Sequence, residues 1–205
     1  MHPEALTEES NELLLSLREF DGFYLAGGTG LALQIGHRVS EDFDFFTEDY
    51  LPENFLGSVE GVFSDRAITP SVNNSEELTV FINNTKVTFL RYPFPLVSEL
   101  LEYRGISLIH LEEIAATKAY TIGRRGSFKD YVDLYFCLKG EYVSIDEIME
   151  MAREKYEKRF NSRLFLEQLV YLDDIEETAI QFIQPKVGKK ELSSFFKKEI
   201  AKIDL

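Results

Sequence analysis

The sequence predicts an α+β fold in which a small mixed sheet with helices is followed by a bundle of helices. Residues 23–95 alternate short β-type runs with turn signals, whereas apolar residues after Pro95 recur at spacings of three and four. The chain has 205 residues, of which 44% are hydrophobic, so it contains ample material for a core. We therefore expect an α/β core in residues 1–95 and a helical domain in residues 96–205, joined at "RYPFPL".

The first part contains five strand-like segments and two expected helices. The strand-like segments are "FYLA" (23–26), "FDFF" (43–46), "RAITPSV" (66–72), "LTVFI" (78–82) and "KVTFLRY" (86–92). The last two form an expected hairpin that turns at Asn83 and Asn84, because asparagine tolerates positive φ. Helices are expected near residues 29–37 and 52–63, the second with Pro52 in its first turn.

The second part contains five segments with helical periodicity. They are "HLEEIAATKAYTIG" (110–123), "FKDYVDLYFCL" (128–138), "SIDEIMEMAREKY" (144–156), "SRLFLEQLVYL" (162–172) and "KKELSSFFKKEIAKI" (189–203). Ser144 and Glu147 are spaced as a capping box, which predicts that a helix begins at this point. These segments predict a helical bundle.

The net charge of −14 argues against a protein whose main task is to coat nucleic acid, because that task needs clustered Lys and Arg. It leaves room for a local basic groove. One basic cluster comprises Arg104, Lys118, Arg124, Arg125 and Lys129, and a second comprises Lys186, Lys189, Lys190, Lys197 and Lys198. We expect the second cluster to be a solvated helix face.

The single cysteine, Cys137, lies in the apolar setting "LYFCLKG" and has no partner for an intramolecular disulfide. A buried thiol is therefore expected. The N-terminal segment is acidic and amphipathic, unlike a secretory signal, and no apolar run is long enough to span a membrane. These features predict a cytoplasmic protein without a membrane partner.

Gly27 and Gly28 follow the strand-like segment "FYLA" and precede an expected helix. Such an arrangement places backbone N–H groups at a helix N-terminus, where the absence of Cβ atoms lets a ligand approach closely. A phosphate group suits this position. The alternative is a tight turn that binds nothing.

Asp42 and Asp44 lie in "EDFDFF" and alternate with two phenylalanines. In a strand the two carboxylates project to one face, about 7 Å apart at Cα, while Phe43 and Phe45 turn toward the core. Two carboxylates so placed repel each other unless a cation lies between them, and oxygen ligands suit Mg²⁺ or Mn²⁺. The alternative is a solvated strand face, although aspartate is disfavoured in strands.

Gly-Gly at a helix start, followed by D-x-D on the next strand, resembles the signature of the polymerase-β-like nucleotidyltransferase superfamily. The segments "GGTGLALQIGHRVSEDFDFF" (27–46) and "IAATKAYTIGRRGSFKDYVDLYFCL" (114–138) resemble the AbiEii/AbiGii toxin family more closely. This family is the toxin half of bacterial type IV toxin–antitoxin and abortive-infection systems. The resemblance covers about residues 20–140 and implies a nucleotidyltransferase fold whose helical domain completes the active site.

The resemblance also implies roles for individual residues. It assigns Gly27, Gly28 and Thr29 to the nucleoside triphosphate, Asp42 and Asp44 to the metal, Ser40 to the lining of the same site, Lys118 to a phosphate contact and Asp130 to the downstream catalytic acid. Lys118 is expected to be a mobile point charge on a long stem, which suits a polyphosphate. Arg38 is the preferred additional phosphate ligand, since its guanidinium suits phosphate geometry. His37 is either a core histidine or an arm of the site, and Asp133 is expected to be structural.

One position departs from the pattern of the superfamily. Many members carry a third carboxylate on a later strand, but "KVTFLRY" has none and places Thr88 at the corresponding position. Either the enzyme uses two strand carboxylates together with Asp130, or metal binding is weak and catalysis is impaired.

The function implied by the resemblance is in-line transfer of a nucleotide from an NTP to an acceptor, with Mg²⁺ or Mn²⁺ as cofactor. By analogy the acceptor is an RNA such as a tRNA 3′ end, and a cognate antitoxin is a potential partner. Two alternatives remain open. One is transfer to a small molecule or a protein hydroxyl, and the other is a catalytically degenerate fold that serves as a binding module.

Overall fold

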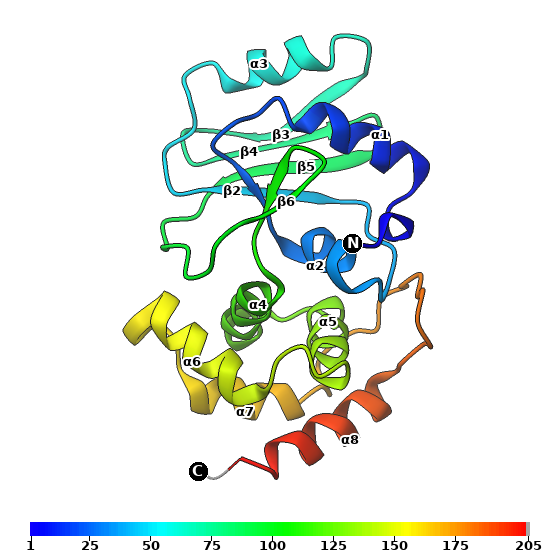
Figure 1. The fold of residues 1–205 in the computed structure, drawn as a ribbon, viewed down its shortest axis with the longest axis vertical. Helices are drawn as coiled ribbons and strands as arrows, with labels where there is room; N and C mark the ends of the chain where they lie inside the picture. The colour runs from blue at the N-terminus through cyan, green and yellow to red at the C-terminus, as the bar shows by residue number, and fades with distance from the viewer. Residues whose placement is uncertain (204–205) are drawn as a thin grey trace. The chain divides into compact units, whose positions relative to one another are not determined.

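The computed structural model describes residues 1–203, which form two compact units (Figure 1). The first unit comprises residues 1–95 and 99–109 and holds the sheet. The second comprises residues 96–98 and the chain from His110 onward, and its helices run from α4 to α8. The combination of a sheet unit and a helical unit confirms the expected α+β class.

The sheet has seven strands in the order β3-β4-β5-β2-β1-β7-β6. The strands are β1 Tyr24–Leu25, β2 Phe43–Thr47, β3 Ile68–Asn73, β4 Glu77–Ile82, β5 Thr85–Arg91, β6 Leu101–Tyr103 and β7 Ile106–Leu108. Strand β1 is antiparallel to β2 and parallel to β7, and β2 is parallel to β5, so the sheet is mixed. Among the central strands, β2 carries Asp44 of the D-x-D motif, and β1 and β5 are the neighbours of β2 in the sheet.

Strands β6 and β7 correct the sequence-based prediction, which placed residues 101–108 in the helical part. They form a short hairpin whose turn residues, Arg104 and Gly105, have φ of 54° and 81°. Each strand has three residues, which is too few for an alternating pattern to be visible in the sequence. Their place in the sheet depends on pairing between β7 and β1, a contact between distant segments.

The core of the first unit lies on one face of the sheet. Phe43 and Phe45 of β2 are buried there with apolar residues of α1 (Glu8–Leu17), which follows the 3₁₀ helix η1 (Pro3–Ala5), and of α3 (Phe55–Val62). Asp44 and Phe46 alternate with them and are only half-buried. Burial of each phenylalanine contributes about 1.5–3 kcal/mol, which fixes the register of β2 and hence the face that its polar residues occupy.

Three local predictions in this unit can be compared with the structure. The hairpin between β4 and β5 turns at Asn83, whose φ is 54°, as expected. Helix α2 covers Gly27–Ile35, so both glycines of the motif lie in its first turn. Helix α3 begins at Phe55 after an N-cap at Asn54, so the expectation that Pro52 lies in its first turn is wrong. Instead, the carbonyl of Pro52 accepts a hydrogen bond from the Phe55 amide at 3.2 Å.

In the part of the chain that the structure describes, the second unit is built from five α-helices. They are α4 Leu111–Arg125, α5 Phe128–Lys139, α6 Ile145–Tyr156, α7 Ser162–Val170 and α8 Lys189–Ile200, with the 3₁₀ helix η2 Glu157–Arg159 after α6. The capping box at the start of α6 is confirmed, since the Ser144 amide donates to Glu147 at 2.7 Å and the Glu147 amide donates to Ser144 Oγ at 3.2 Å. Cys137 is buried as predicted, and burial raises the pKa of its thiol.

A buried ion pair attaches residues 96–98 to the helical unit. Lys155 Nζ of α6 lies 2.6 Å from Glu113 Oε1 of α4, and both side chains are completely buried. The Glu113 carboxylate also accepts hydrogen bonds from the Val97 amide at 3.1 Å and the Ser98 amide at 2.9 Å. The segment is therefore held by its backbone, which explains why its sequence carries no helical signal.

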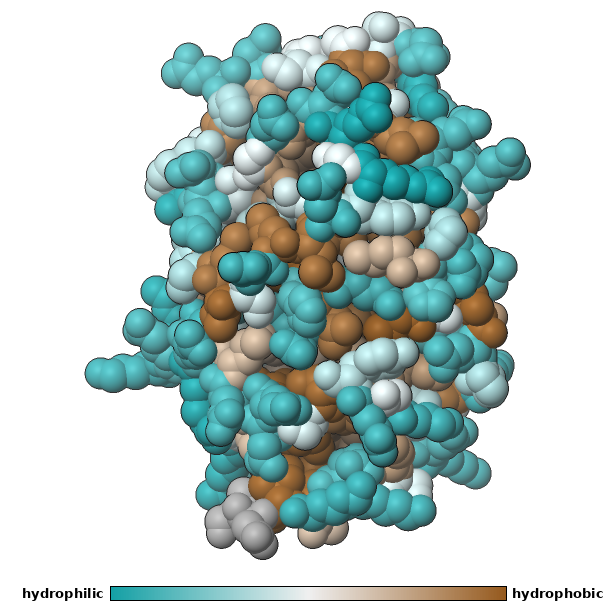
Figure 2. Space-filling view, viewed as in Figure 1, coloured by the Kyte–Doolittle hydropathy of each residue, from teal (hydrophilic) through white to brown (hydrophobic). Residues whose placement is uncertain are grey.

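The surface combines hydrophilic and hydrophobic areas. On the face drawn in Figure 2, hydrophilic side chains surround several separate hydrophobic areas. Within residues 1–203, none of the helices combines the length and the apolar character needed to cross a membrane. This finding agrees with the sequence, in which no apolar run reaches that length.

Candidate active site

Asp44 lies at the centre of the sheet, on strand β2. On one side, Asp44 is paired with Thr88 of β5. On the other side, just after the end of β1, the Ala26 amide donates to the Asp44 carbonyl at 2.8 Å. The hydrogen bond between Ala26 and Asp44 brings the start of α2 directly against β2. The Gly-Gly motif and the D-x-D motif, which are separate in the sequence, are thereby placed side by side.

Gly27 packs against the carboxylate of Asp44. Its φ is +62°, and a Cβ atom at this position would lie 2.5 Å from Asp44 Oδ2. Glycine is required here both for the backbone conformation and for the space that the carboxylate occupies. The N-cap residue of α2, Ala26, provides no side-chain cap, and backbone N–H groups in the first turn of a helix are the groups that hold phosphate at phosphate-binding helix starts.

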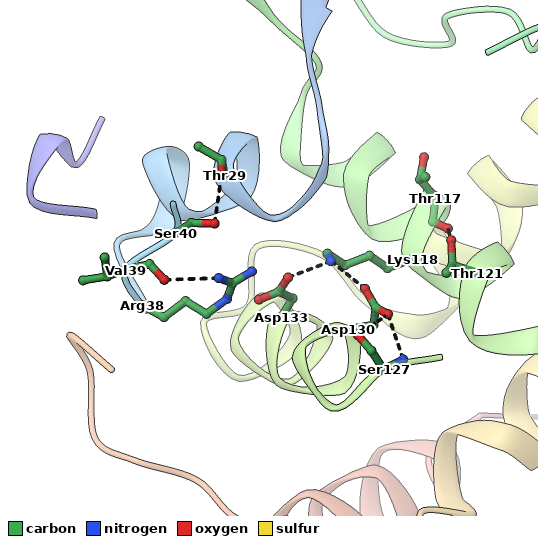
Figure 3. A network of polar contacts seen from close by, with 10 residues as sticks. All are labelled: Thr29, Arg38, Val39, Ser40, Thr117, Lys118, Thr121, Ser127, Asp130 and Asp133. Carbon is green, nitrogen blue, oxygen red and sulfur yellow. Dashed lines mark hydrogen bonds and ion pairs between the residues drawn. The ribbon is translucent and has the colours of Figure 1, made fainter. Parts of the chain in front are cut away.

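Thr29 connects the helix start to the segment before β2. Its hydroxyl donates to Ser40 Oγ at 2.8 Å (Figure 3). The same hydroxyl also contacts the carbonyl oxygen of Asp42. Thr29 is buried, and Ser40 is almost as inaccessible. In this arrangement the Thr29 hydroxyl positions the backbone of Asp42, a role that differs from the nucleotide contact implied by the family resemblance.

Asp42 itself directly precedes β2 and is exposed, whereas Asp44 is half-buried. Arg38, the preferred phosphate ligand, is buried, and its Nη1 donates to the Val39 carbonyl at 3.2 Å (Figure 3). His37 is completely buried. The first unit thus brings the start of α2, the Ser40 segment and the two aspartates together.

The chemistry of Asp42 and Asp44 fits a divalent cation that is shared with a substrate. Within residues 1–203, no group of three or more His, Cys, Asp or Glu residues is arranged to hold a metal ion. Mg²⁺ is commonly held by one or two carboxylates together with substrate phosphates and water, so a site of this type needs only this pair. The close contact of Gly27 with Asp44 leaves that carboxylate at the helix start, where phosphates would bind.

Thr88 occupies the strand position beside Asp44, where the resemblance to the superfamily led us to expect a third carboxylate. It is paired with Asp44 across β2 and β5 and is buried. Its hydroxyl lies 3.3 Å from that of Thr79 on β4, with which it forms a hydrogen bond. A neutral hydroxyl contributes no charge to a metal site, so β5 supplies no carboxylate opposite Asp44.

Lys118, Asp130 and Asp133 form a buried cluster in the helical unit. Lys118 Nζ on α4 lies 2.9 Å from Asp130 Oδ1 and 2.6 Å from Asp133 Oδ2, both on α5 (Figure 3). The side chain of Lys118 is 8% exposed, and that of Asp133 is fully buried. The expectation of a mobile ammonium on a long stem is therefore not what the structure contains, because two carboxylates fix this lysine in place.

Asp130 also caps the start of its own helix. Its Oδ2 accepts hydrogen bonds from the Ser127 amide at 3.0 Å and from Ser127 Oγ at 2.8 Å, which completes a capping box. Burial alone would raise the pKa of Asp130, but the Lys118 ammonium and the Ser127 amide outweigh it and hold the pKa below its ordinary value. The S-x-x-D spacing of Ser127 and Asp130 is a sequence signal that could have predicted this cap.

We expect Gly27→Ala to impair both folding and activity. The new Cβ atom would require φ of +62° in a residue that disfavours it and would push against Asp44 Oδ2. The loss of stability should exceed about 1 kcal/mol, and displacement of the carboxylate should lower nucleotidyl transfer by about 10²-fold. Urea unfolding and an activity assay measure the two effects.

Gly61→Ala is the matched control, because Gly61 lies inside α3 and a Cβ atom added there would have no neighbour within 4 Å. This substitution should stabilise the protein by about 0.5–1 kcal/mol and leave activity unchanged. Equal effects of the two substitutions would contradict the close packing of Gly27 on Asp44.

The pKa of Asp130 predicts a specific loss of stability in acid. The folded-state pKa of Asp130 lies below the unfolded value of about 4. The contribution of the ionised Asp130 carboxylate to the free energy of unfolding is therefore fully present at neutral pH and is lost as pH falls through the folded-state pKa. Asp130→Asn should therefore lose less stability between neutral pH and about pH 2 than the parent does. Urea midpoints across this range measure the difference, and Asp146→Asn, at an exposed first-turn carboxylate of α6, should follow the parent curve.

Known proteins include a relative in sequence and structures with a fold similar to the one described above. A relative in Aquifex aeolicus, described as uncharacterised, is 30% identical over 194 residues, which is 94% of this chain and 93% of that protein. The structure is similar to MenT4, a nucleotidyltransferase toxin of Mycobacterium tuberculosis, with a TM-score of 0.58, 16% identity, and coverage of 95% of this chain and 85% of that one. It is also similar to a candidate nucleotidyltransferase of Helicobacter pylori, with a TM-score of 0.56, 20% identity and 96% coverage of both chains.

These two structures share the nucleotidyltransferase fold, in agreement with the sheet and helix start described above. The family comparison goes further than the fold. The profile described as nucleotidyl transferase AbiEii toxin of type IV toxin–antitoxin systems matches residues 13–93 and 80–203, nearly the whole chain. The protein therefore belongs to the AbiEii family of nucleotidyltransferase toxins.

Proposed function

We propose that this protein transfers a nucleotide from an NTP to an RNA acceptor, such as a tRNA 3′ end, as the toxin of a toxin–antitoxin pair. The observation that carries the proposal is the packing of Gly27, at the start of α2, against the Asp44 carboxylate of β2. This contact brings a helix start, of the kind that can bind phosphate, next to the Asp44 carboxylate, which supports the proposal. Membership of the AbiEii family supports the same reaction, a cognate antitoxin as partner and a cytoplasmic site of action.

In the proposed reaction, the acceptor hydroxyl oxygen bonds to the α-phosphorus of the NTP and pyrophosphate leaves. The proton of that hydroxyl passes to the carboxylate pair Asp42 and Asp44. The N–H groups of Gly27 and Gly28 hold the triphosphate, and Thr29 and Ser40 keep the Asp42 segment in place. Bound Mg²⁺ or Mn²⁺ would be held by Asp42 and Asp44 and would neutralise charge on the phosphates.

We also assign Lys118 to a phosphate contact and Asp130 to the downstream catalytic acid in this proposal. Since Lys118 is already paired with Asp130 and Asp133, its ammonium is held in one place and needs no reorganisation during the reaction. Arg38 is the proposed additional group for phosphate.

A label-transfer assay tests the proposal. Purified protein, Mg²⁺ and total bacterial RNA are incubated with each α-labelled NTP in turn, with and without a chelator. Label in a tRNA-sized band that disappears with the chelator is the expected result, and the active NTP identifies the donor. If label never enters RNA under any of these conditions, the RNA acceptor is wrong.

A pocket in the first unit favours a second candidate, transfer to a small cationic acceptor that carries a hydroxyl group. The pocket has a volume of about 600 Å³ and is bordered by Asp42 and by the start of α1. Its carboxylates are Glu8, Glu9, Glu12, Glu41 and Asp42, and no basic residue lines it. Such a pocket would repel a polyanion and attract a cation. Label recovered on an added hydroxylated polyamine or aminoglycoside, and not on RNA, would favour this candidate.

A further inference from the structure

The C-terminal end of α4, the start of α5 and helix η2 form a positively charged surface on an otherwise acidic protein. The basic residues of this surface are Arg124, Arg125, Lys129, Lys158 and Arg159, all of them exposed. Arg125 and Lys129 lie on either side of the short connection at residues 126–127. We propose that this surface, called here the α4–η2 surface, binds the phosphate backbone of the RNA acceptor, an inference that rests on the proposed function.

A hydrogen bond of Arg124 joins two elements of the surface, α4 and η2. Its Nη2 donates to the Arg159 carbonyl at 2.9 Å, and its Nη1 donates to the Tyr120 carbonyl at 3.0 Å. The guanidinium also lies over the Tyr120 ring, 3.5 Å from the ring centroid. Neutral carbonyl groups and an aromatic face order the side chain without cancelling its charge, which keeps the charge available to an anion.

Three neighbouring basic side chains, Arg125, Lys129 and Lys158, also keep a positive charge that no carboxylate in the described part of the chain neutralises. Within residues 1–203, Arg125, Lys129 and Lys158 form no ion pair with a carboxylate. The nearest acidic residues in the sequence are Asp130, which is paired with Lys118, and Glu157, which is exposed beside Lys158. Arg125, Lys129 and Lys158 thus present three positive charges from α4, α5 and η2 in a chain with a net charge of −14, and this arrangement indicates an anionic partner.

The surface lies close to the helical residues of the candidate active site. Arg125 follows Lys118 by seven residues on α4, which corresponds to about 10 Å along the helix. Lys129 directly precedes Asp130 in the first turn of α5. An RNA backbone that follows these cations would therefore pass near Lys118 and Asp130.

Two features favour RNA over a membrane surface. The large exposed apolar side chains found within residues 1–203 lie elsewhere in the chain, so this surface offers no apolar anchor for a bilayer. Arginine stacked on tyrosine is also suited to contacts with unpaired bases. The lysines of α8 form a second basic region, but they alternate with Glu191 and Glu199 on the same helix.

The test compares two triple variants with the same change in net charge. Arg125→Gln/Lys129→Gln/Lys158→Gln removes the free charges of the α4–η2 surface, and Lys190→Gln/Lys197→Gln/Lys198→Gln removes three exposed charges of α8. Binding of purified tRNA is measured as a function of salt, without NTP or metal. The first variant should bind at least about tenfold more weakly, with a salt slope smaller by about 2, and the second should bind like the parent.

Each other outcome has a definite meaning. Equal binding by both variants and the parent, or a loss confined to the α8 variant, would show that the α4–η2 surface is not the RNA site, while the proposed RNA acceptor would stand. If the parent itself binds no tRNA and transfers no label to RNA, the proposed function fails together with this inference. Binding of both variants to anionic vesicles measures the membrane alternative, and vesicle binding that is lost only in the first variant would overturn the proposal.

Discussion

Asp44→Asn is expected to lower nucleotidyl transfer by about 10³-fold, because the substitution removes a charge beside the proposed phosphate site. Asparagine has nearly the same shape as aspartate, so the contact with Gly27 and the pairing of β2 with β5 should persist. Transfer of label from NTP under saturating substrate measures the effect. Thermal unfolding of the same sample should show a stability close to that of the parent.

Asp49→Asn is the matched control for this prediction. Asp49 lies just beyond the end of β2, is exposed, and its amide donates to Thr47 Oγ1 at 3.3 Å. The same chemical change at this position should leave activity within about twofold of the parent. If Asp44→Asn retained activity comparable to that of Asp49→Asn, the proposed carboxylate site would be wrong, and the degenerate binding module would become the better interpretation.

Asp42→Asn should lower activity less than Asp44→Asn does, by about 10²-fold. Asp42 is exposed, so surrounding water already weakens the interactions of its charge. Loss of the Thr29 hydroxyl in Thr29→Val should act on the same step, since this hydroxyl contacts the Asp42 carbonyl. The two substitutions combined should then cost less than the product of their separate effects.

Lys155→Met is expected to have the largest effect on stability, about 3–5 kcal/mol. Lys155 and Glu113 are both fully buried, so removal of the ammonium leaves the Glu113 carboxylate without its cation. The amides of Val97 and Ser98 would still donate to Glu113 but cannot neutralise its charge. Urea unfolding at neutral pH measures the loss.

The double variant Glu113→Gln/Lys155→Met tests the cause of this effect. Glutamine can still accept from the Val97 and Ser98 amides without carrying a charge, so a large part of the lost stability should return. Lys129→Met, at an exposed position in the same unit, should change stability by less than about 0.5 kcal/mol. A loss in the double variant equal to that of Lys155→Met would show that packing, and not the unpaired charge, holds this region together.

Local chemistry explains which features could be predicted. The alternation of Phe43 and Phe45 with Asp44 fixes a strand and its buried face, because only one register buries both rings. The Asn83 turn and the Ser144–Glu147 cap depend on residues that are adjacent or three apart in the sequence. Short-range patterns of this kind do not require knowledge of the rest of the fold.

Features that depend on distant contacts could not be predicted in the same way. Strands β6 and β7 have three residues each and are strands because β7 pairs with β1. Lys118 was expected to be a mobile phosphate ligand, but the packing of α4 against α5 places it between two carboxylates. Neither arrangement is visible from residue types alone, since both depend on partners that the chain brings together only when folded.

Residue types and their spacings were enough to predict the α+β class, because glycine, aspartate and apolar residues at fixed spacings restrict local structure strongly. The family was predicted from the resemblance of two sequence segments to its motifs, and the family profile confirms it. Three contacts became visible only in the folded chain: Gly27 touches Asp44, Thr29 holds the Asp42 backbone, and Lys155 neutralises Glu113. The second and third of these contacts join residues that are 13 and 42 positions apart. Their geometry follows from packing, and packing is a property of the whole fold.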